Sequence, residues 1–337
     1  MVLDTTQQLG WSWEGTEGTD PINAVNALYW YFGVRTTDLT DLHPTKKQQW
    51  SPTYKVNTRN PSDMALVKNT TAGRYGFYPV NGIPLHMILG DVTLNTPGAG
   101  INTFDNINTG NLKTFTVRSE STGGTVDKWI SSTGCKATSL SGYINLLGDF
   151  KFLSEILTYN GLATATSTSL AAIHTTGVMY PTSDYTMTSA NQIDDRYKYD
   201  TNTLFSWNAN DIIDDLCILK YDLVNLQDIK HIDGQAATKY IDEGNYQFVL
   251  SFSLWRGNTN TDAVWTDYLA GTQRNVVFTI YNTAANYRQL TFTNVSLMTM
   301  EADYSMGEDK ALWHCHGLVE DVTAVVKDGV STSFFPE

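Results

Sequence analysis

The chain has 337 residues, of which 41% are hydrophobic and 17% charged, and 22 Lys and Arg stand against 35 Asp and Glu, giving a net charge of −13. This length can bury a substantial core, and an acidic chain without a basic run lacks what nucleic-acid-binding proteins use to hold phosphates. The acidic balance either lets DNA pass nearby without sticking or simply keeps the chain soluble.

The same composition favours a β protein. The uncharged remainder is rich in Thr, Asn, Ser and Gly, which are typical of strands and turns. Aromatic residues make up 12% of the chain and suit either a Tyr-rich core or extensive subunit contacts. The first residues lack a cationic start and an apolar run, and no stretch approaches about 20 apolar residues. We therefore expect no signal peptide, no membrane segment and no Sec export.

Residues 1–112 are interpreted as an N-terminal segment with loops or an arm. Turn residues such as Asn60-Pro61 and Pro97-Gly98 interrupt short apolar runs at 27–34 and 83–94. The aromatic run at 27–34 favours a strand. Three widely spaced cysteines (Cys135, Cys217 and Cys315) are not the pattern of a disulfide framework.

Strand patterns become clearer from residue 112 onward. Leu112–Glu120 alternates as a strand. Cys135–Leu147 and Phe150–Leu157 are strand candidates separated by Gly148-Asp149, which suits a two-residue type II′ hairpin turn. The charge-poor residues 161–203, rich in Thr and Ser, predict an extended loop insertion.

Tyr246–Trp255 has the most regular alternation of the chain, with aromatic and aliphatic residues on one face and Gln and Ser on the other. A helix is predicted next, with Thr261-Asp262 as its N-cap and Gly271 as its C-terminal stop. Further strands are predicted at Asn275–Tyr281, at Gln289–Met300 and, as a pair, around Leu312–Val326. The whole pattern predicts a mainly β chain with one helix, folded as one large domain or as two smaller ones.

His314-Cys315-His316 is one candidate for chemistry. In a strand the two imidazoles point to one side and Cys315 to the other, so the three cannot hold one metal without a bend. Ordinary strand residues are the alternative interpretation. The remaining histidines (His43, His86, His174 and His231) are scattered singly. We expect no catalytic, cofactor or metal site.

Two groups of residues support other functions. The carboxylates of a hydrolase would come from the acidic cluster Asp211, Asp214 and Asp215, with Asp233, Asp242 and Glu243 further along, although acidic clusters on turns are also ordinary solvated surface. A glycan-binding or adhesive β-sandwich is the alternative suggested by the tryptophans, which include Trp11, Trp13, Trp30 and Trp255.

Several motifs occur in a suggestive order. Gly134-Cys135-Lys136 opens a Ser-rich strand through Ser141-Gly142, a second strand and the loop 159–161 follow, and Asp242–Phe248 leads into the long strand before the helix. In this order, residues 113–326 resemble the tail tube (major tail) proteins of tailed phages and archaeal viruses. Gly15–Pro21 is similar to the "GT-x-P" opening of that family. Residues 36–112 and 161–203 have no counterpart and are interpreted as surface decorations or inter-ring arms.

The resemblance implies a single domain with its core in residues 113–326, built as a β-sandwich or small barrel with one short flanking α-helix. It also implies that six subunits join their sheets into a ring with a shared inner β-barrel. Stacked rings then form a hollow tail tube that conducts the genome during ejection, without an enzymatic role or a cofactor. The implied partners are other copies of the chain, a tape-measure protein, a tail terminator and, in a contractile tail, a sheath. DNA would pass through the lumen without specific binding, and the protein would belong to the virion tail, assembled in the host cytoplasm.

Overall fold

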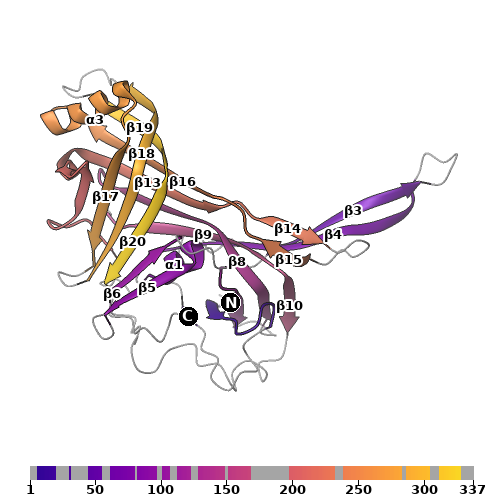
Figure 1. Ribbon diagram of the computed structural model, residues 1–337. Coiled ribbons are helices and arrows are strands. Elements are labelled where there is room, and N and C mark those ends of the chain that lie inside the picture. The colour runs from indigo at the N-terminus through magenta and orange to yellow at the C-terminus, as the bar shows by residue number, and fades with distance from the viewer. Residues whose placement is uncertain are drawn as a thin grey trace, which may run out of the picture.

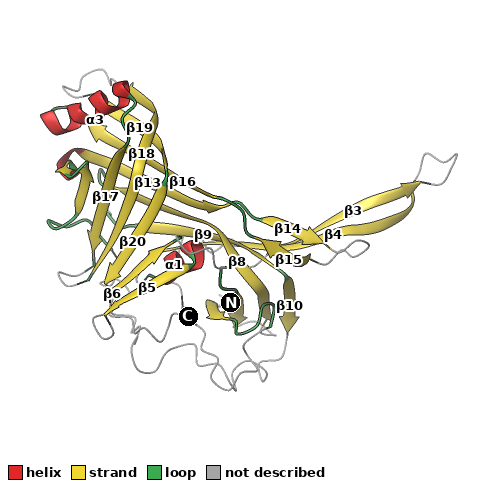
Figure 2. Ribbon diagram, in the orientation of Figure 1, coloured by secondary structure: helices red, strands yellow, loops and turns green. Residues whose placement is uncertain are grey.

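The computed structural model describes residues 6–19, 30–31, 45–54, 61–79, 82–96, 101–106, 112–122, 128–148, 151–167, 197–231, 238–282, 286–303 and 311–327. This part of the chain is mainly β, with two α-helices and one 3-10 turn (Figure 2). Eighteen strands join in one continuous antiparallel network, and β14 (Asp228–His231) and β15 (Thr238–Asp242) pair with each other. The predicted β class is confirmed.

One region of the network, which we call the front sheet, has the strand order β4–β9–β8–β13–β16–β19–β18 (Figure 1). Its strands are β4 (Pro61–Phe77), β8 (Lys128–Asn145), β9 (Ser154–Gly161), β13 (Leu216–Asn225), β16 (Tyr246–Trp255), β18 (Tyr287–Asp303) and β19 (Leu312–Val319). The alternation predicted for Tyr246–Trp255 is confirmed: β16 has these bounds, and Phe248, Leu250 and Phe252 are buried.

A second region, the back sheet, has the order β5–β6–β20–β18–β17–β11–β12. Its other strands are β5 (Asp91–Thr96), β6 (Ile101–Asp105), β11 (Leu204–Trp207), β12 (Asn210–Asp211), β17 (Arg274–Tyr281) and β20 (Asp321–Lys327). β18 belongs to both sheets: residues 287–293 pair with β20 and residues 296–303 with β19. The change of sheet falls at Asn294, whose φ of 52° is a left-handed conformation that Asn tolerates better than most residues.

A third group of strands continues the first half of β8, in the order β2–β1–β7–β8–β10. It contains β1 (Thr6–Trp13), β2 (Trp30–Tyr31), β7 (Phe115–Thr122) and β10 (Ala163–Ser167). The predicted loop 161–203 is therefore a strand where it begins, because Ala163–Ser167 pairs with the edge of β8. Residues 168–196 of that prediction lie outside the described residues.

The front and back sheets face each other across the core. Tyr221 in β13 lies with its ring centroid 6.2 Å from that of Phe292 in β18, and the Phe205 and Phe252 rings are 5.3 Å apart. The N-terminal segment also contributes to this core, through Trp11 and through α1 (Ile83–Leu89), all of whose residues are buried. The single helix expected from the sequence is thus one of two in the described residues.

A buried polar trio joins the two sheets. Glu155 in β9 accepts hydrogen bonds from the Tyr221 hydroxyl and from the Arg288 guanidinium in β18, and Glu155 and Arg288 are 0–1% exposed. Burial, followed by the neighbouring Glu155, raises the pKa of Tyr221 well above its ordinary value, so its hydroxyl remains a donor. Removing either Glu155 or Arg288 would leave the other charged group buried in the core without a counter-charge.

α3 (Thr259–Ala270) covers one end of this assembly (Figure 1). Its N-cap is Asn258, whose side chain accepts from the backbone of Asn260 and Thr261, so the predicted cap at Thr261-Asp262 was three residues late. The predicted stop at Gly271 is confirmed by its left-handed φ of 63°. Asp267 anchors the helix by accepting from Arg274 and from the Trp207 indole at 2.8 Å, and these contacts, led by Arg274, lower the pKa of Asp267.

The predicted β8–β9 hairpin exists, but its connection is longer than a two-residue turn. β8 ends at Asn145 and β9 begins at Ser154, with Tyr143 and Ser154 as the last pair, so the proposed turn residue Gly148 lies within a wider loop. The expected loop at 159–161 is instead the end of β9. Leu153 at the end of this loop is fully buried, and its amide donates to the Tyr197 carbonyl. The end of the loop is therefore packed against the core.

A long hairpin of β3 (Thr45–Tyr54) and the first part of β4 projects away from the sheets (Figure 1). Residues 45–54 pair with residues 61–72, whereas residues 71–77 of β4 join the front sheet beside β9. Strand β4 is therefore shared by the projecting hairpin and the front sheet. This hairpin lies within the residues that have no counterpart in the tail tube resemblance.

The Gly142 position gives a test of the buried trio. Tyr221, Gly142 and Glu155 are register partners across β13, β8 and β9, and a Cβ at Gly142 would overlap the Tyr221 ring. We expect Gly142→Ala to lower the free energy of unfolding by about 1–3 kcal/mol because the ring must move away from Glu155. In the control Gly148→Ala, the nearest atoms to the new Cβ are 3.8 Å away. Equal thermal unfolding temperatures for both variants would contradict this account.

Candidate functional site

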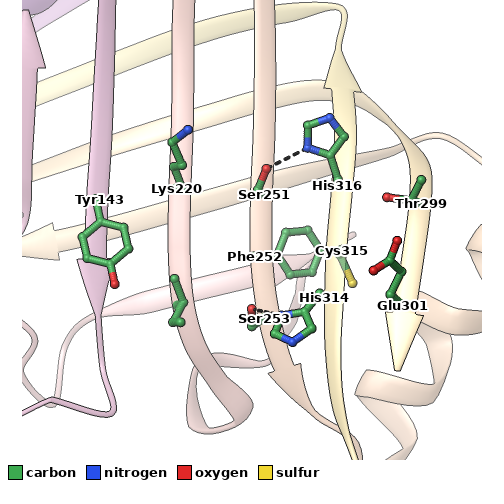
Figure 3. A pocket seen from close by; sticks show the side chains of 11 residues that line it. Tyr143, Lys220, Ser251, Phe252, Ser253, Thr299, Glu301, His314, Cys315 and His316 are labelled. Carbon is green, nitrogen blue, oxygen red and sulfur yellow. Dashed lines mark hydrogen bonds between the residues drawn. The ribbon is translucent and has the colours of Figure 1, made fainter. Parts of the chain in front are cut away.

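The outer face of the front sheet carries two rows of mainly polar side chains. Because strand side chains alternate, register partners form rows across the sheet. One row contains Tyr143, Lys220, Ser251, His316 and Thr299, and the next contains Asn145, Ile218, Ser253, His314 and Glu301. We call these two rows the polar face. All of these residues except Asn145 line an open hollow of about 340 Å³ (Figure 3).

The sequence prediction for His314-Cys315-His316 is confirmed in its geometry. Cys315 is 2% exposed and points into the core, whereas His314 and His316 are exposed on the polar face. Each imidazole shares a hydrogen bond with a serine of β16: His314 Nδ1 lies 2.8 Å from Ser253 Oγ, and His316 Nδ1 lies 2.9 Å from Ser251 Oγ. Burial raises the pKa of the Cys315 thiol to about 12, so it stays protonated.

This arrangement does not gather metal ligands. Figure 3 shows the His314 and His316 rings pointing apart along β19. Within the described ranges, no three His, Cys, Asp or Glu side chains come together as a metal ion would need. The serine–imidazole pairs instead resemble ordinary cross-strand hydrogen bonds on a wet sheet surface.

Charges on the polar face are few and nearly balanced. Lys220 is the one Lys or Arg in the two rows, and its ammonium lies 2.8 Å from Asp222 in the same strand. Glu301 adds a negative charge at the β18 side (Figure 3). A phosphate backbone lying on this face would therefore meet hydroxyl and imidazole groups and little net positive charge.

The acidic residues suggested for hydrolysis have separate structural roles. Asp211 accepts from the amide of Ile213 at 3.0 Å and so begins the 3-10 turn η3 (Ile213–Asp215). Asp215 is buried and accepts from the Asn258 side chain, whereas Asp214 is exposed. Asp233 lies outside the described residues. Asp211 therefore accepts from the backbone of the 3-10 turn, and Asp215 accepts from the N-cap residue of α3. These hydrogen bonds give both carboxylates a structural role.

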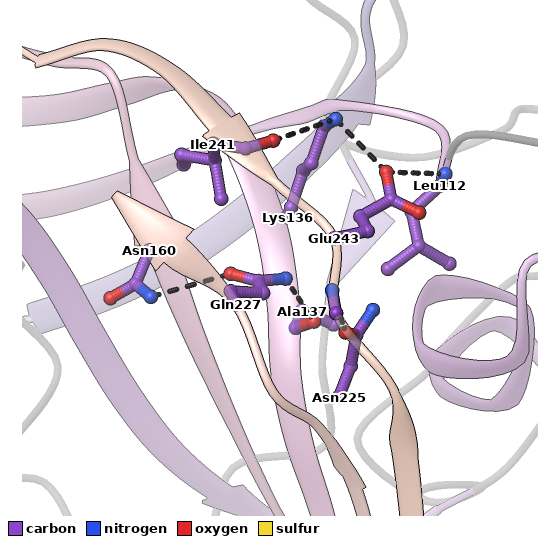
Figure 4. A network of polar contacts seen from close by, with 9 residues as sticks. Leu112, Lys136, Ala137, Asn160, Asn225, Gln227, Ile241 and Glu243 are labelled. Carbon is purple, nitrogen blue, oxygen red and sulfur yellow. Dashed lines mark hydrogen bonds and ion pairs between the residues drawn. The ribbon is translucent and has the colours of Figure 1, made fainter. Parts of the chain in front are cut away.

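Glu243 belongs to a polar network at the other end of the front sheet (Figure 4). Its carboxylate lies 2.9 Å from the Lys136 ammonium and accepts from the Leu112 amide at 2.8 Å, and Lys136 also donates to the Ile241 carbonyl. Nearby, Gln227 donates to the Ala137 carbonyl at 2.7 Å. The network fastens the β14–β15 hairpin and the start of β16 onto β8.

Of the tryptophans suggested for glycan binding, the three with described side chains do not form one exposed surface. Trp11 is 1% exposed, Trp13 packs edge-on against the His86 ring at 5.0 Å, and Trp255 is half-buried. The side chain of Trp30 is outside the described part of the structure. Trp265 of α3, which the sequence did not suggest for binding, is 36% exposed, and its ring centroid lies 5.5 Å from that of Trp313.

No protein-family model matches the chain, and a search of curated proteins finds no match. Neither helix of the described residues is long and apolar enough to cross a membrane.

The Lys136–Glu243 pair provides a test of the structural role of the acidic residues. We expect Glu243→Gln to cost about 2–3 kcal/mol in unfolding free energy, because it leaves the buried Lys136 ammonium without a counter-charge. The adjacent control Asp242→Asn removes a carboxylate that is 50% exposed and 3.9 Å from Lys230, and should change stability by less than about 0.5 kcal/mol. Denaturant unfolding measures both, and the reverse order would overturn the assignment.

Proposed function

We propose that this chain is a virion structural protein, the subunit of a hollow tail tube built from stacked hexameric rings that conducts the genome during ejection. The family resemblance of residues 113–326 motivates the hexamer and the shared inner β-barrel. In this proposal the chain works through assembly and has no catalytic residue. Its partners are other copies of itself, a tape-measure protein, a tail terminator and, in a contractile tail, a sheath.

The polar face is the observation that carries this proposal. It is a broad, one-sided surface on five antiparallel strands, with hydroxyl, imidazole and paired charged groups in rows. A surface of this kind can line an aqueous lumen, because it binds water well and gives DNA no cluster of lysines or arginines to hold. The chain's net charge of −13 supports the same conclusion.

The edge of the front sheet is consistent with contacts between subunits. Residues 296–303 of β18 pair with β19 on one side, and no described strand pairs with their other side, although α3 packs nearby. Unpaired backbone groups at a sheet edge favour addition of another chain's strand unless they are protected. A bulge interrupts the ladder between Leu297 and Thr299. The part of this edge on which a neighbouring subunit's strand could pair is therefore residues 299–303.

Assembly of the purified full chain tests the proposal. We expect sedimentation velocity to show a species several times the 37.5 kDa subunit mass, and negative-stain electron microscopy to show six-fold rings or tubes. DNA added to these particles should not be retained at physiological salt, because the polar face offers no basic cluster. A strictly monomeric protein at high concentration would contradict the proposal.

A further inference from the structure

The hollow on the polar face exists because neighbouring strands carry outward side chains of different length. Over β16 these side chains are the short Ser251 and Ser253, which form the floor. Longer side chains rise on either side, Lys220 from β13 and the two histidines from β19 (Figure 3). β13 and β19 are two strand spacings apart, or about 10 Å. The hollow is therefore narrow, with room for one small ligand.

The size and lining of the hollow also suit a small molecule. Its volume of about 340 Å³ lies at the lower end of the range for small-molecule sites, which is about 300–1,000 Å³. Two lining residues offer apolar surface: Tyr143 on β8 is 41% exposed, and Ile218 on β13 is half-buried. A ligand seated here would contact an aromatic ring and an aliphatic side chain as well as polar groups.

Each imidazole of the hollow keeps one ring nitrogen for a ligand. Serine hydroxyls hold Nδ1 of His314 at 2.8 Å and Nδ1 of His316 at 2.9 Å, which leaves Nε2 of each ring. A hydroxyl can donate or accept, so each ring can adopt either neutral tautomer and keep its serine partner. Nε2 donates to a ligand when the serine donates to Nδ1, and it accepts when the serine accepts. Both rings can thus hydrogen-bond a ligand group of either kind.

The other polar groups of the hollow include both donors and acceptors. Glu301 is exposed and supplies carboxylate acceptors, and Thr299 adds an exposed hydroxyl. The Lys220 ammonium lies 2.8 Å from Asp222, which balances its charge. An ammonium group has three N–H donors, so this ion pair leaves donors of Lys220 for a ligand.

This combination selects a neutral ligand that is rich in hydroxyl groups. A phosphate or carboxylate would meet one cation that Asp222 already balances, and Glu301 would repel it. A cation would meet one carboxylate among the described residues that line the hollow. A purely apolar ligand would take water from the imidazoles and hydroxyls without replacing its hydrogen bonds. Sugar hydroxyls both donate and accept, and the C–H groups of a sugar ring can lie against Tyr143 and Ile218.

We propose that the hollow of the polar face is a binding site for a neutral sugar of one or two rings. His314, His316 and Glu301 hydrogen-bond the sugar hydroxyls, and Tyr143 packs against the C–H groups of the ring. The inference goes beyond the proposed function and does not depend on it, because one subunit supplies the whole site. The two are compatible, since a small sugar can enter a water-filled channel.

Saturation-transfer difference NMR on the full-length chain tests the class of ligand. The probes are the methyl glycosides of glucose, galactose, mannose and N-acetylglucosamine and the disaccharides lactose and cellobiose, each at up to about 10 mM. Glucose 6-phosphate and cyclohexanol are the charged and the apolar comparison. We expect at least one neutral sugar to bind saturably and more tightly than either comparison compound. Failure of all six neutral sugars to bind, or tighter binding of a comparison compound, would contradict the proposal.

Matched variants test the place of binding. Tyr143→Ala removes the aromatic ring and Glu301→Gln removes the carboxylate, and each should raise the Kd of the bound sugar at least about tenfold. Their controls, Leu318→Ala and Asp303→Asn, alter exposed residues of β19 and β18 outside the hollow and should change the Kd less than about twofold. Equal thermal unfolding temperatures show that the variants are folded.

The outcome is separate from that of the tube proposal, which electron microscopy of the assembled chain decides. If the wild-type chain binds a sugar but Tyr143→Ala or Glu301→Gln leaves the Kd unchanged, or if the controls weaken binding as much, the sugar lies elsewhere and the inference is wrong. Rings that form without any sugar binding would leave the tube proposal standing and overturn this site.

Discussion

Alternate burial along β13, β16 and β19 is the constraint on which the other features of the molecule depend. In β16, Phe248, Leu250 and Phe252 enter the core, so Gln247 and Ser251 must lie on the opposite face. A one-residue slip would put the apolar set into water, which makes the register strongly specified. The same alternation that builds the core therefore also places the two rows of the polar face on the opposite side of the sheet. In our account that surface, rather than a pocket with reactive groups, is what the protein offers to its surroundings.

Buried polar groups make this arrangement specific. Glu155, Tyr221 and Arg288 come from three strands in two facing sheets, and their hydrogen bonds require one relative position of those sheets. Lys136 and Glu243 similarly fasten the β14–β15 hairpin to β8. These contacts fix the relative positions of the two sheets and of the β14–β15 hairpin. Fixed relative positions are what a subunit needs if its surfaces must meet those of identical neighbours.

The sequence allowed the periodic elements to be predicted, but not which residues of different elements contact one another. β16, the end of α3 at Gly271 and the opposite orientations of His314 and Cys315 all follow from local patterns of two or about four residues. α1 was missed because all seven of its residues are buried, and an apolar run without a polar face does not distinguish helix from strand. Glu155 and Arg288 are 133 positions apart, so no local pattern could connect them. The rows of the polar face likewise depend on long-range register.

We propose in particular that the polar faces of the assembled subunits surround a shared, water-filled channel. Electron cryomicroscopy of the assembled wild-type chain, at a resolution that traces β13, β16 and β19, measures this directly. The account predicts that Lys220, His314 and His316 line the inner wall of a ring or tube. An assembly in which these residues face outward, or lie buried against another subunit with no channel in front of them, would contradict it.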